Sequence, residues 1–306
     1  MTIDRWSRGV RLAPSLVACL LLLRVAVPSS AQQPAGRHVL LHRIADADSV
    51  VYILGSVHLA RADLYPLGAS IEQAFAESER LAVEVDVRAV DEGALSRSVV
   101  ERGLQPAGRT LRGELGEQGA ERLGARLAGL GMRADSLDPF KPWVACTMLP
   151  AMELLLLGYD PAQGVDLHFL ARAGDREIVE LETVQSQLDL LAGFSDAEQL
   201  ALLADYLAGA DTMADEMAAL LDAWLAGDAA GMEKLLDADL GGSEVGRRVE
   251  QLMLRQRDAA MAERIAGLLA SPGTTFVVIG AAHTIGEGSV VDLLARRGFS
   301  VTTLRD

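Results

Sequence analysis

The sequence predicts an α/β fold with a parallel-rich central sheet, covering helices, and a helical insertion or cap. Two observations predict the sheet: residues 50–87 have the pattern strand, helix, strand, and residues 274–304 repeat that order at the C-terminal end. A crossover through a helix places its two strands parallel to each other. The insertion is predicted by a third observation, the long stretches of helical periodicity between the two units.

Composition narrows the possible functions before any motif is considered. The chain has 306 residues, half of them hydrophobic, so it can bury one large core or two modest ones. Its formal net charge is -15, and Lys141 and Lys234 are its only lysines. Because phosphate binding depends on clustered Lys and Arg, a nucleic-acid partner is not expected.

The segment 1–31 has the pattern of a secretory signal peptide. A start that carries arginines precedes the apolar run LVACLLLLRVAV, and the small residues PSSA end the segment at Ala31. Cleavage there would leave a mature chain of residues 32–306. The protein is therefore predicted to be exported, either to the periplasm or out of the cell.

Two alternatives remain for this segment. LVAC resembles a lipoprotein processing site, which would anchor the protein through a lipid on Cys19, but most of the apolar run follows this cysteine instead of preceding it. An uncut leader would be an anchor, but a membrane span requires about 20 apolar residues, and Arg24 interrupts this run. We predict no transmembrane span in the mature chain.

Cys146 is the only cysteine of the predicted mature chain, so an internal disulfide is excluded. It lies within the apolar run WVACTML. A catalytic thiol requires a nearby base, and we therefore interpret Cys146 as a buried structural cysteine.

The first unit begins with a predicted hairpin. HVLLHRI and VVYILGS are two strands joined by the polar turn ADADS, and the second strand, apolar on both faces, is expected to be central. ASIEQAFAESER follows as a helix, in which Ser70 and Gln73 form a capping-box pattern. RLAVEVDV then returns to the alternation of a strand.

Most of the middle of the chain is predicted to be helical. Residues 89–160 and 185–270 are rich in Ala, Leu and charged residues at helical spacing, and one further strand, REIVELE, lies near 176–182. We interpret these helices as layers over the sheet or as a cap over the site. No linker divides the chain, so residues 32–306 are predicted to form a single domain.

The second unit closes the chain. RIAGLLA ends a helix, TTFVVIG is an apolar strand, EGSVVDLLARRG is a helix that ends at Gly298, and FSVTTL is the last strand. Its strands are expected to join the sheet of the first unit.

Both units place a Gly-x-x-His motif directly after their first strand, Gly55 to His58 and Gly280 to His283. Ligands collect beyond the carboxyl ends of parallel strands, so the two histidines are expected to meet over one edge of the sheet. The glycines permit a close backbone approach or a positive φ. A lone histidine after a strand is more often a helix cap or a satisfied core residue, and only the matched pair favours a site. The remaining histidines lack this setting and are interpreted as structural or exposed: His38, His42 and His168.

Glu84 is the carboxylate that most requires an explanation. The alternation in RLAVEVDV places it in the middle of an apolar strand, where a carboxylate is costly unless it is paired, protonated or bound to a metal. A salt bridge to an arginine of a covering helix would satisfy it. Alternatively, Glu84, His58 and His283 form a ligand set suited to Zn, Mn, Co or Fe, with open positions for water.

An ordered set of motifs resembles the TraB/PrgY/GumN family. The set consists of GSVH, VEVD, FKPW, VELETVQSQL, AWLAGD, the arginine Arg257 in LRQRDAAMAERI, and VVIGAAHTIGEGSVVDLLARRGFSV. No single motif is specific to the family, but the whole set in this order is a much stronger signal. The resemblance spans residues 38–304. Tiki metalloproteases belong to the same superfamily, and the erythromycin esterase and ChaN-like proteins are similar more distantly.

The resemblance implies a site made of the two Gly-x-x-His motifs, the strand glutamate and an arginine before the last helix: Gly55, His58, Gly280, His283, Glu84 and Arg257. The chain departs from the family pattern at four positions, with Asp258 for Asn, Glu180 for Gly, Ala282 for Gly and Thr284 for Leu. These departures leave the histidines and Glu84 intact, so they concern the substrate more than the site.

The implied function is that of an exported metal-dependent hydrolase, in particular a peptidase acting on a peptide or another small substrate. His58 and His283 would hold a divalent cation (Mn, Co or Zn) that polarises a carbonyl and lowers the pKa of a bound water. Glu84 would either complete the ligand set or take the proton from that water. Arg257 would stabilise the developing oxyanion or orient Glu84.

Two other classes of protein fit the same residues. One is a non-catalytic protein that binds a peptide or a metal in the same pocket. The other is a metal-independent, esterase-like hydrolase in which His and Glu act as general bases.

Overall fold

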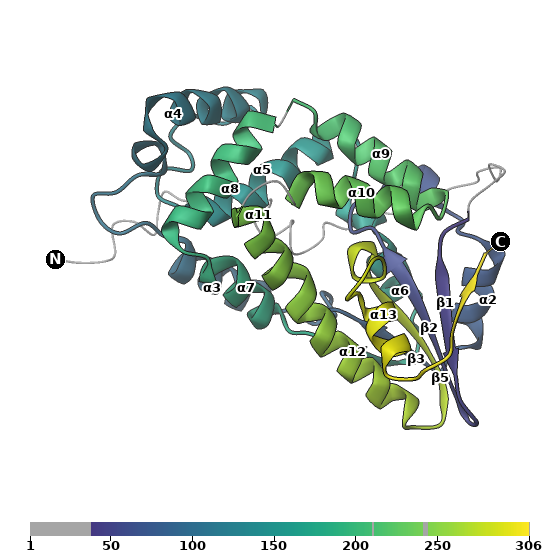
Figure 1. Cartoon of the computed structure of the whole chain (residues 1–306). Coiled ribbons are helices and arrows are strands. Elements are labelled where there is room, and N and C mark those ends of the chain that lie inside the picture. The colour runs from purple at the N-terminus through teal and green to yellow at the C-terminus, as the bar shows by residue number, and fades with distance from the viewer. Residues whose placement is uncertain (1–37, 210, 241–243, 306) are drawn as a thin grey trace.

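A computed structural model describes residues 38–209, 211–240 and 244–305 (Figure 1). Six strands in this part of the chain form one sheet, in the order β4-β3-β5-β2-β1-β6. The predicted signal peptide and its cleavage site after Ala31 lie outside the described residues.

The sheet is mixed but mostly parallel. Its strands are β1 (Leu41–Ala45), β2 (Ser49–Ser56), β3 (Arg80–Val83), β4 (Glu177–Glu180), β5 (Gly273–Gly280) and β6 (Val301–Leu304). Strands β2, β5, β3 and β4 pair in parallel, and β1 pairs antiparallel with both β2 and β6. The predicted α/β class with a parallel-rich sheet is therefore confirmed.

The predicted hairpin is formed by β1 and β2, whose polar turn is closed by one carboxylate. Oδ1 of Asp46 accepts hydrogen bonds from the backbone N–H groups of Asp48 (3.2 Å) and Ser49 (2.8 Å), and from the Ser49 hydroxyl (2.8 Å). These bonds satisfy the backbone donors of the turn, which explains why a run of small and acidic residues follows β1.

Strand β5 enters the sheet between the two strands of the first unit. It pairs with β2 on one side, as in Ile53 with Val277, and with β3 on the other, as in Leu81 with Phe276. The strands β2 and β3 are thus parallel, as predicted, but they are not neighbours. The most apolar strand of the C-terminal unit occupies a central place, where helices cover both faces.

One face of the sheet is covered by α12 (Gln256–Leu269) and α13 (Val290–Arg296) (Figure 1). Ile265 of α12 and Leu294 of α13 are fully buried in one cluster with Ile53, Val277 and Ile279 of the sheet. The apolar stripe of each helix therefore faces the odd-numbered side chains of β2 and β5.

The opposite face is covered by α2 (Ala69–Glu77) and α6 (Val165–Ala171). Phe75 of α2 and Phe169 of α6 pack on Phe276 of β5. The predicted capping box of α2 is wrong, because the helix begins at Ala69 and the extended Gly68 is its N-cap. Ser70 lies inside the first turn, where its hydroxyl is not in the capping position.

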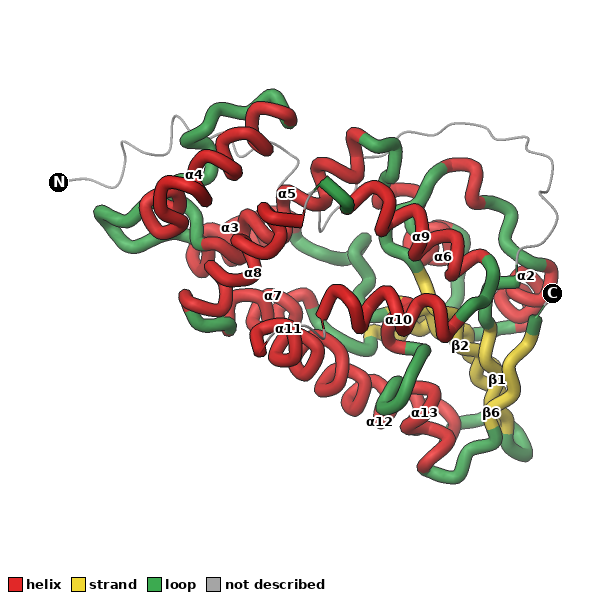
Figure 2. Tube along the Cα trace, turned by 45° about the horizontal axis from the view of Figure 1, so that its top comes forward, coloured by secondary structure: helices red, strands yellow, loops and turns green. Residues whose placement is uncertain are grey.

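The predicted helical middle is present, with α3 (Glu92–Gly103), α4 (Leu111–Gly129), α5 (Pro142–Leu156), α7 (Val184–Gly193), α8 (Asp196–Gly209), α9 (Met213–Leu225), α10 (Ala229–Leu240) and α11 (Glu244–Val249). Helices α3, α4, α5, α7 and α8 form an apolar cluster of their own, beside the sheet (Figure 2). Helices α9 and α10 reach back over the sheet, where Trp224 and Met232 join its core. The prediction of a single domain over 32–306 remains a prediction.

Within the described residues, no helix is both long enough and apolar enough to span a membrane.

Cys146 of α5 is a free, partly buried cysteine. Burial raises the pKa of its thiol to about 12, which agrees with the interpretation of Cys146 as structural.

Candidate active site

The four parallel strands end at one edge of the sheet, and the predicted site residues leave the strands there. Ser56 of β2 lies opposite Gly280 of β5 in the strand register. The loops that carry His58 and His283 therefore begin side by side, although the two histidines are far apart in the sequence.

Glu84 lies at the same edge, which corrects its predicted place in the middle of a strand. β3 ends at Val83, so Glu84 is the first residue beyond it. The pairing of β3 with β5 stops at Val83 and Val278, and two positions further along β5 the Gly280 N–H donates to the Glu84 side chain, with 2.7 Å between N and Oε1. The Glu84 carboxylate therefore accepts the Gly280 N–H at the point where the pairing of β3 with β5 ends.

The two histidines and Glu84 surround Gly280. A methyl group placed on Gly280 would lie 3.2 Å from His58 Nε2, 3.3 Å from Glu84 Oε1 and 3.5 Å from His283 Cδ2. Because His58 Nε2 and His283 Cδ2 lie this close to the same point, the two rings are closer together than the span of about 7 Å expected for two histidines that share one metal. The structure thus brings His58, His283 and Glu84 together, and a side chain on Gly280 would occupy the space between them.

Gly55 has a different role from Gly280. A methyl group on it would lie 2.7 Å from the Thr284 hydroxyl and 3.0 Å from Ala281 Cα, so only glycine lets β2 approach the loop after β5 this closely. The Gly55 carbonyl accepts a hydrogen bond from the Trp224 indole at 2.8 Å. Gly55 therefore packs the loops against each other instead of facing the site.

His58 is held by a carboxylate from α6. Its Nδ1 lies 2.8 Å from Asp166 Oδ2, and the buried Ser56 hydroxyl donates to the other Asp166 oxygen at 2.9 Å. The negative charge of Asp166 raises the pKa of His58 to about 9. With Nδ1 engaged by Asp166, Nε2 is the ring nitrogen that faces Gly280.

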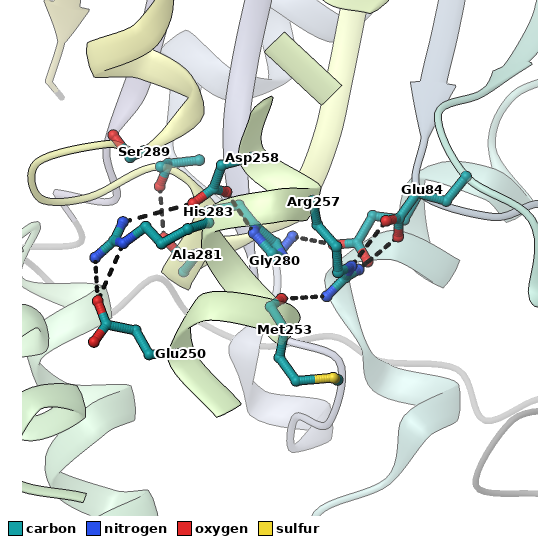
Figure 3. A network of polar contacts seen from close by, with 12 residues as sticks. Glu84, Glu250, Met253, Arg257, Asp258, Gly280, Ala281, His283 and Ser289 are labelled. Atoms are coloured by element: carbon teal, nitrogen blue, oxygen red, sulfur yellow. Dashed lines mark hydrogen bonds and ion pairs between the residues drawn. The ribbon is translucent and has the colours of Figure 1, made fainter. Parts of the chain in front are cut away.

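His283 has a matching partner on α12. Its Nδ1 lies 2.7 Å from Oδ1 of Asp258, and both side chains are buried (Figure 3). Burial raises the pKa of Asp258, and the hydrogen bond with His283 opposes that rise. Because a carboxylate only accepts, Nδ1 carries the proton and a neutral His283 keeps its lone pair on Nε2.

Arg257 of α12 binds two glutamates. Its Nη2 lies 2.6 Å from Oε2 of Glu84 and 2.6 Å from Oε2 of Glu182, and its Nε donates to Glu182 Oε1 at 2.8 Å (Figure 3). The Arg257 Nη1 donates to the Met253 carbonyl at 3.0 Å. The salt bridge from Glu84 to a covering helix, one of the two predicted explanations of Glu84, is therefore present at the site.

Glu84 is ionised in this setting. Burial alone raises the pKa of its carboxyl group, but His58, His283, Arg257 and the Gly280 amide together lower it to about 2. The charge of Glu84 is thus stabilised by groups from three different loops or helices.

A π-helical segment, Glu250–Arg255, runs directly into α12. At its end the Gln256 N–H bonds the Gln251 carbonyl, five residues back in place of four. In a regular helix the Arg257 backbone N–H would bond the Met253 carbonyl. Here the Arg257 side chain bonds that carbonyl, which fixes the guanidinium beside Glu84.

The donor chemistry of the site suits a divalent cation. Metal-bound histidines commonly carry a carboxylate on their other ring nitrogen, and both His58 and His283 do so. Among the described residues, no group of three or more His, Cys, Asp or Glu side chains has its atoms placed so that they could hold a metal ion. The two oxygens of Glu84 already accept hydrogen bonds from Gly280 and Arg257.

A pocket of about 240 Å³ adjoins the two histidines, and we call it the apolar pocket. It is lined by the segments that follow β2 and β5, including His58, Gly280 and His283, and by side chains of α9 and α10, including Leu220 and Trp224. A second cavity, of about 580 Å³, lies among α5, α8 and α9 and reaches Met253.

Sequence reasoning missed the carboxylates that hold the site: Asp166, Glu182 and Asp258. Glu182 is the last residue of a predicted strand, so the rule that pointed to His58 and His283 could have found it. Asp258 had one signal, its place next to Arg257. Asp166 had none, because it lies on a short helix far from His58 in the sequence.

The chain was compared with known proteins and structures. It is 28% identical over 303 residues to an uncharacterized protein of Treponema pallidum (strain Nichols), covering 93% of this chain and 87% of that protein. It is 24% identical over 245 residues to the uncharacterized protein YbaP of Escherichia coli (strain K12), covering 79% and 87% respectively. No solved structure matches the chain significantly.

The sequence pattern of one protein family matches residues 40–303, a range that contains both Gly-x-x-His motifs, Glu84 and Arg257. The match covers β1 to β5 in full, β6 except for its last residue, and the helices between them. This chain belongs to the TraB/PrgY/gumN family.

Proposed function

We propose that this chain is an exported, metal-dependent hydrolase that cleaves peptides. The observation that carries the proposal is the grouping of two histidines and an ionised glutamate around Gly280. Two imidazoles and one carboxylate are a common ligand set of hydrolytic metal sites.

His58 and His283 would hold the cation, and Mn, Co or Zn suits these donors. When bound, such a cation polarises a carbonyl and lowers the pKa of a water molecule. Asp166 and Asp258 act on the two histidines. A carboxylate on Nδ1 fixes the orientation of each ring. Binding of the cation would displace the Nε2 proton that His58 carries at neutral pH, because the pKa of His58 is raised to about 9.

Glu84 keeps its negative charge in this function. Its pKa of about 2 lies far below neutral pH, whereas a general base works best when its pKa lies near the working pH. The low pKa therefore favours Glu84 as a third ligand over Glu84 as the base that takes a proton from water.

Arg257 orients Glu84. Its guanidinium makes four hydrogen bonds, to Glu84, Glu182 and the Met253 carbonyl. Little of the group is left to contact a substrate oxygen, so the orienting role is favoured over stabilisation of an oxyanion.

A second candidate function is a metal-independent hydrolase, which one observation favours. His58 is exposed over 57% of its side chain and is paired through Nδ1 with Asp166. In many hydrolases a histidine paired in this way exchanges protons with the reacting groups, while the carboxylate holds its orientation. With a pKa of about 9, His58 would be protonated at neutral pH and would act as the acid.

Metal content and peptide cleavage, measured on the same protein, test the proposal. The full chain is expressed with its leader in a secreting host, purified without chelator, and assayed on a mixed peptide library with Mn, Co, Zn or a chelator. We expect bound metal, loss of cleavage with the chelator, and recovery with one of the cations. His58→Ala and His283→Ala should lose both metal and cleavage, whereas His38→Ala, a change at an exposed histidine that is not among the groups around Gly280, should keep both.

Two outcomes would overturn the proposal. Cleavage that survives the chelator in metal-free protein would favour the metal-independent hydrolase. Tight peptide binding without cleavage under any of the cations would favour a non-catalytic binding protein.

A further inference from the structure

Most of the side chains that line the apolar pocket are apolar, and its polar side chains are those of Ser56, His58 and His283. Its wall is made by side chains of α9 and α10, namely Met217, Leu220, Trp224, Met232 and Leu236. None of the described residues that line it is Asp, Glu, Lys or Arg. A charged or strongly polar group placed there would lose its hydration without gaining a partner.

The wall of the apolar pocket is held in place by the core of the sheet. Trp224 and Met232 are buried in the main hydrophobic cluster, and the Trp224 indole donates to the Gly55 carbonyl at 2.8 Å. Leu220 and Leu236 are only partly buried and pack against that cluster. The part of the pocket that Trp224 and Met232 line is therefore preformed, and Leu220 and Leu236 line it as partly buried side chains.

The position of the apolar pocket relates it to the proposed reaction. Gly280 and His283 line both the pocket and the centre where Glu84 and His58 converge. If the carbonyl to be cleaved lies at His58 and His283, a peptide side chain next to that carbonyl must lie close to the apolar pocket. A volume of about 240 Å³ accepts a large side chain.

We propose that the apolar pocket takes up a large apolar side chain, such as Leu, Met or Phe, of the peptide bound at His58 and His283, and so determines which peptides are cleaved. This inference rests on the proposed function for the position of the peptide. Leu220 of α9, partly buried on the pocket wall, is the specificity-determining residue best placed for a test.

Peptides of the form acetyl-Gly-Gly-X-Gly-Gly-amide, with X as Gly, Ala, Leu, Met, Phe, Trp, Asp or Lys, provide that test. Wild-type protein should cleave the Leu, Met and Phe peptides at least ~10-fold faster, in kcat/KM, than the Ala peptide, because each methylene in an apolar pocket contributes about 10-fold or more. Leu220→Trp fills the pocket and should reverse this order, and Leu220→Ala should extend it to Trp. Leu156→Trp is the matched control, since Leu156 is 70% exposed on α5, and it should leave the order unchanged.

A binding measurement separates this inference from the proposed function. In a Trp143→Phe background, Trp224 is the only tryptophan left beyond the leader, so its fluorescence reports occupation of the pocket. Binding of the Leu, Met and Phe peptides without cleavage, weakened by Leu220→Phe, which narrows the pocket without adding a tryptophan, would support the pocket while the proposed function fails. Cleavage at equal rates for every X, in wild type and Leu220→Trp alike, would overturn the pocket and leave the proposed function standing.

Discussion

At the scale of single residues, His58 and His283 have similar partners but different access to solvent. Each has a carboxylate on Nδ1, yet 57% of the His58 side chain is exposed, against 4% for His283. A small molecule therefore reaches the site past His58, while the buried pair of His283 and Asp258 forms its fixed side.

Glu84→Gln tests whether the charge of Glu84 is required. The amide can still accept from Gly280, but its NH₂ group would face the Arg257 guanidinium, donor against donor. We expect cleavage to fall at least ~10²-fold and the free energy of unfolding to fall by about 1–3 kcal/mol, because Arg257 keeps Glu182 as a partner. Urea unfolding and peptide cleavage measure the two effects.

The control for this change is Glu177→Gln, at an exposed glutamate of β4, which should alter neither quantity. If Glu84→Gln unfolds early while its folded fraction still cleaves at the wild-type rate, Glu84 is a structural residue only.

Gly280→Ala tests the space at the centre of the site. Gly280 has a φ of -51°, which alanine adopts without strain, so the effect comes from the methyl group against His58 and Glu84. We expect cleavage and metal binding to be lost with little change in unfolding temperature. Gly267→Ala is the matched control: a methyl group there meets nothing within 4 Å, and alanine in a helix should stabilise the protein by about 0.5–1 kcal/mol. Equal loss of cleavage in both variants would contradict the assignment of Gly280.

At the scale of elements, the site depends on the helix ends that lie beside the carboxyl ends of the parallel strands. The π-helical segment Glu250–Arg255 precedes α12, and the first residues of α12 place Arg257 toward Glu84 and Asp258 toward His283. One helix end therefore serves both halves of the site. On the other side, α7 begins directly after Glu182, and its Gln187 donates to Glu182 at 3.0 Å.

Thr183→Ala tests the start of α7. The Thr183 side chain accepts from the Ser186 N–H in a capping box, and loss of such a cap costs about 0.5–2 kcal/mol. Asp91→Ala removes the equivalent cap of α3, where Asp91 accepts from the Ala94 N–H, and should cost a similar amount. Urea unfolding should show both losses, but only Thr183→Ala should also reduce cleavage, because the start of α7 adjoins Glu182. Unchanged cleavage in Thr183→Ala would show that the cap does not position the site.

At the scale of the whole molecule, the four parallel strands supply one loop each to a single edge, and helices from both sides complete it. Asp166 comes from the face covered by α2 and α6, and Asp258 from the face covered by α12 and α13. The site is therefore sensitive to the packing of both layers on the sheet.

The stability of the whole molecule should fall in mild acid because of His42. This histidine is buried on β1, and burial lowers its pKa from 6.5 to about 4. His42 therefore binds a proton more readily in the unfolded chain than in the folded one. The contribution of neutral His42 to the free energy of unfolding is complete above pH 6.5. It is lost as the pH falls toward 4, by up to about 3 kcal/mol. His42→Leu should make unfolding by urea less dependent on pH over this window. An equal slope in wild type and His42→Leu would contradict the pKa shift.

Export is a prediction for the whole chain that concerns residues outside the described structure. Mass spectrometry of protein from a secreting host should give an N-terminus near Gln32, because the cleavage pattern ends at Ala31. A lipid on Cys19 would change the assignment to a lipid-anchored protein, and a cytoplasmic chain that begins at Met1 would contradict it.

Local patterns in the sequence were enough to predict the elements and part of the site. Short apolar runs beside turn residues identified the hairpin and β5, helical spacing identified the middle region, and the two Gly-x-x-His motifs pointed to one edge of a parallel sheet. These predictions hold because they depend on neighbours within a few residues, where the periods of strand and helix decide which side chains are buried. Their weakest points were the ends of elements, as at Ser70 and Glu84, where capping and pairing partners decide the boundary.

Only the tertiary structure decided which distant groups meet. It placed β5 between β2 and β3, set Asp166 against His58 and Asp258 against His283, and gave Arg257 a second glutamate in Glu182. None of these pairings leaves a local pattern, because each joins elements whose contact depends on the packing of helices on both faces of the sheet. The sequence by itself determined the chemistry available at the edge of the sheet, and the packing of the layers determined which of those groups are partners.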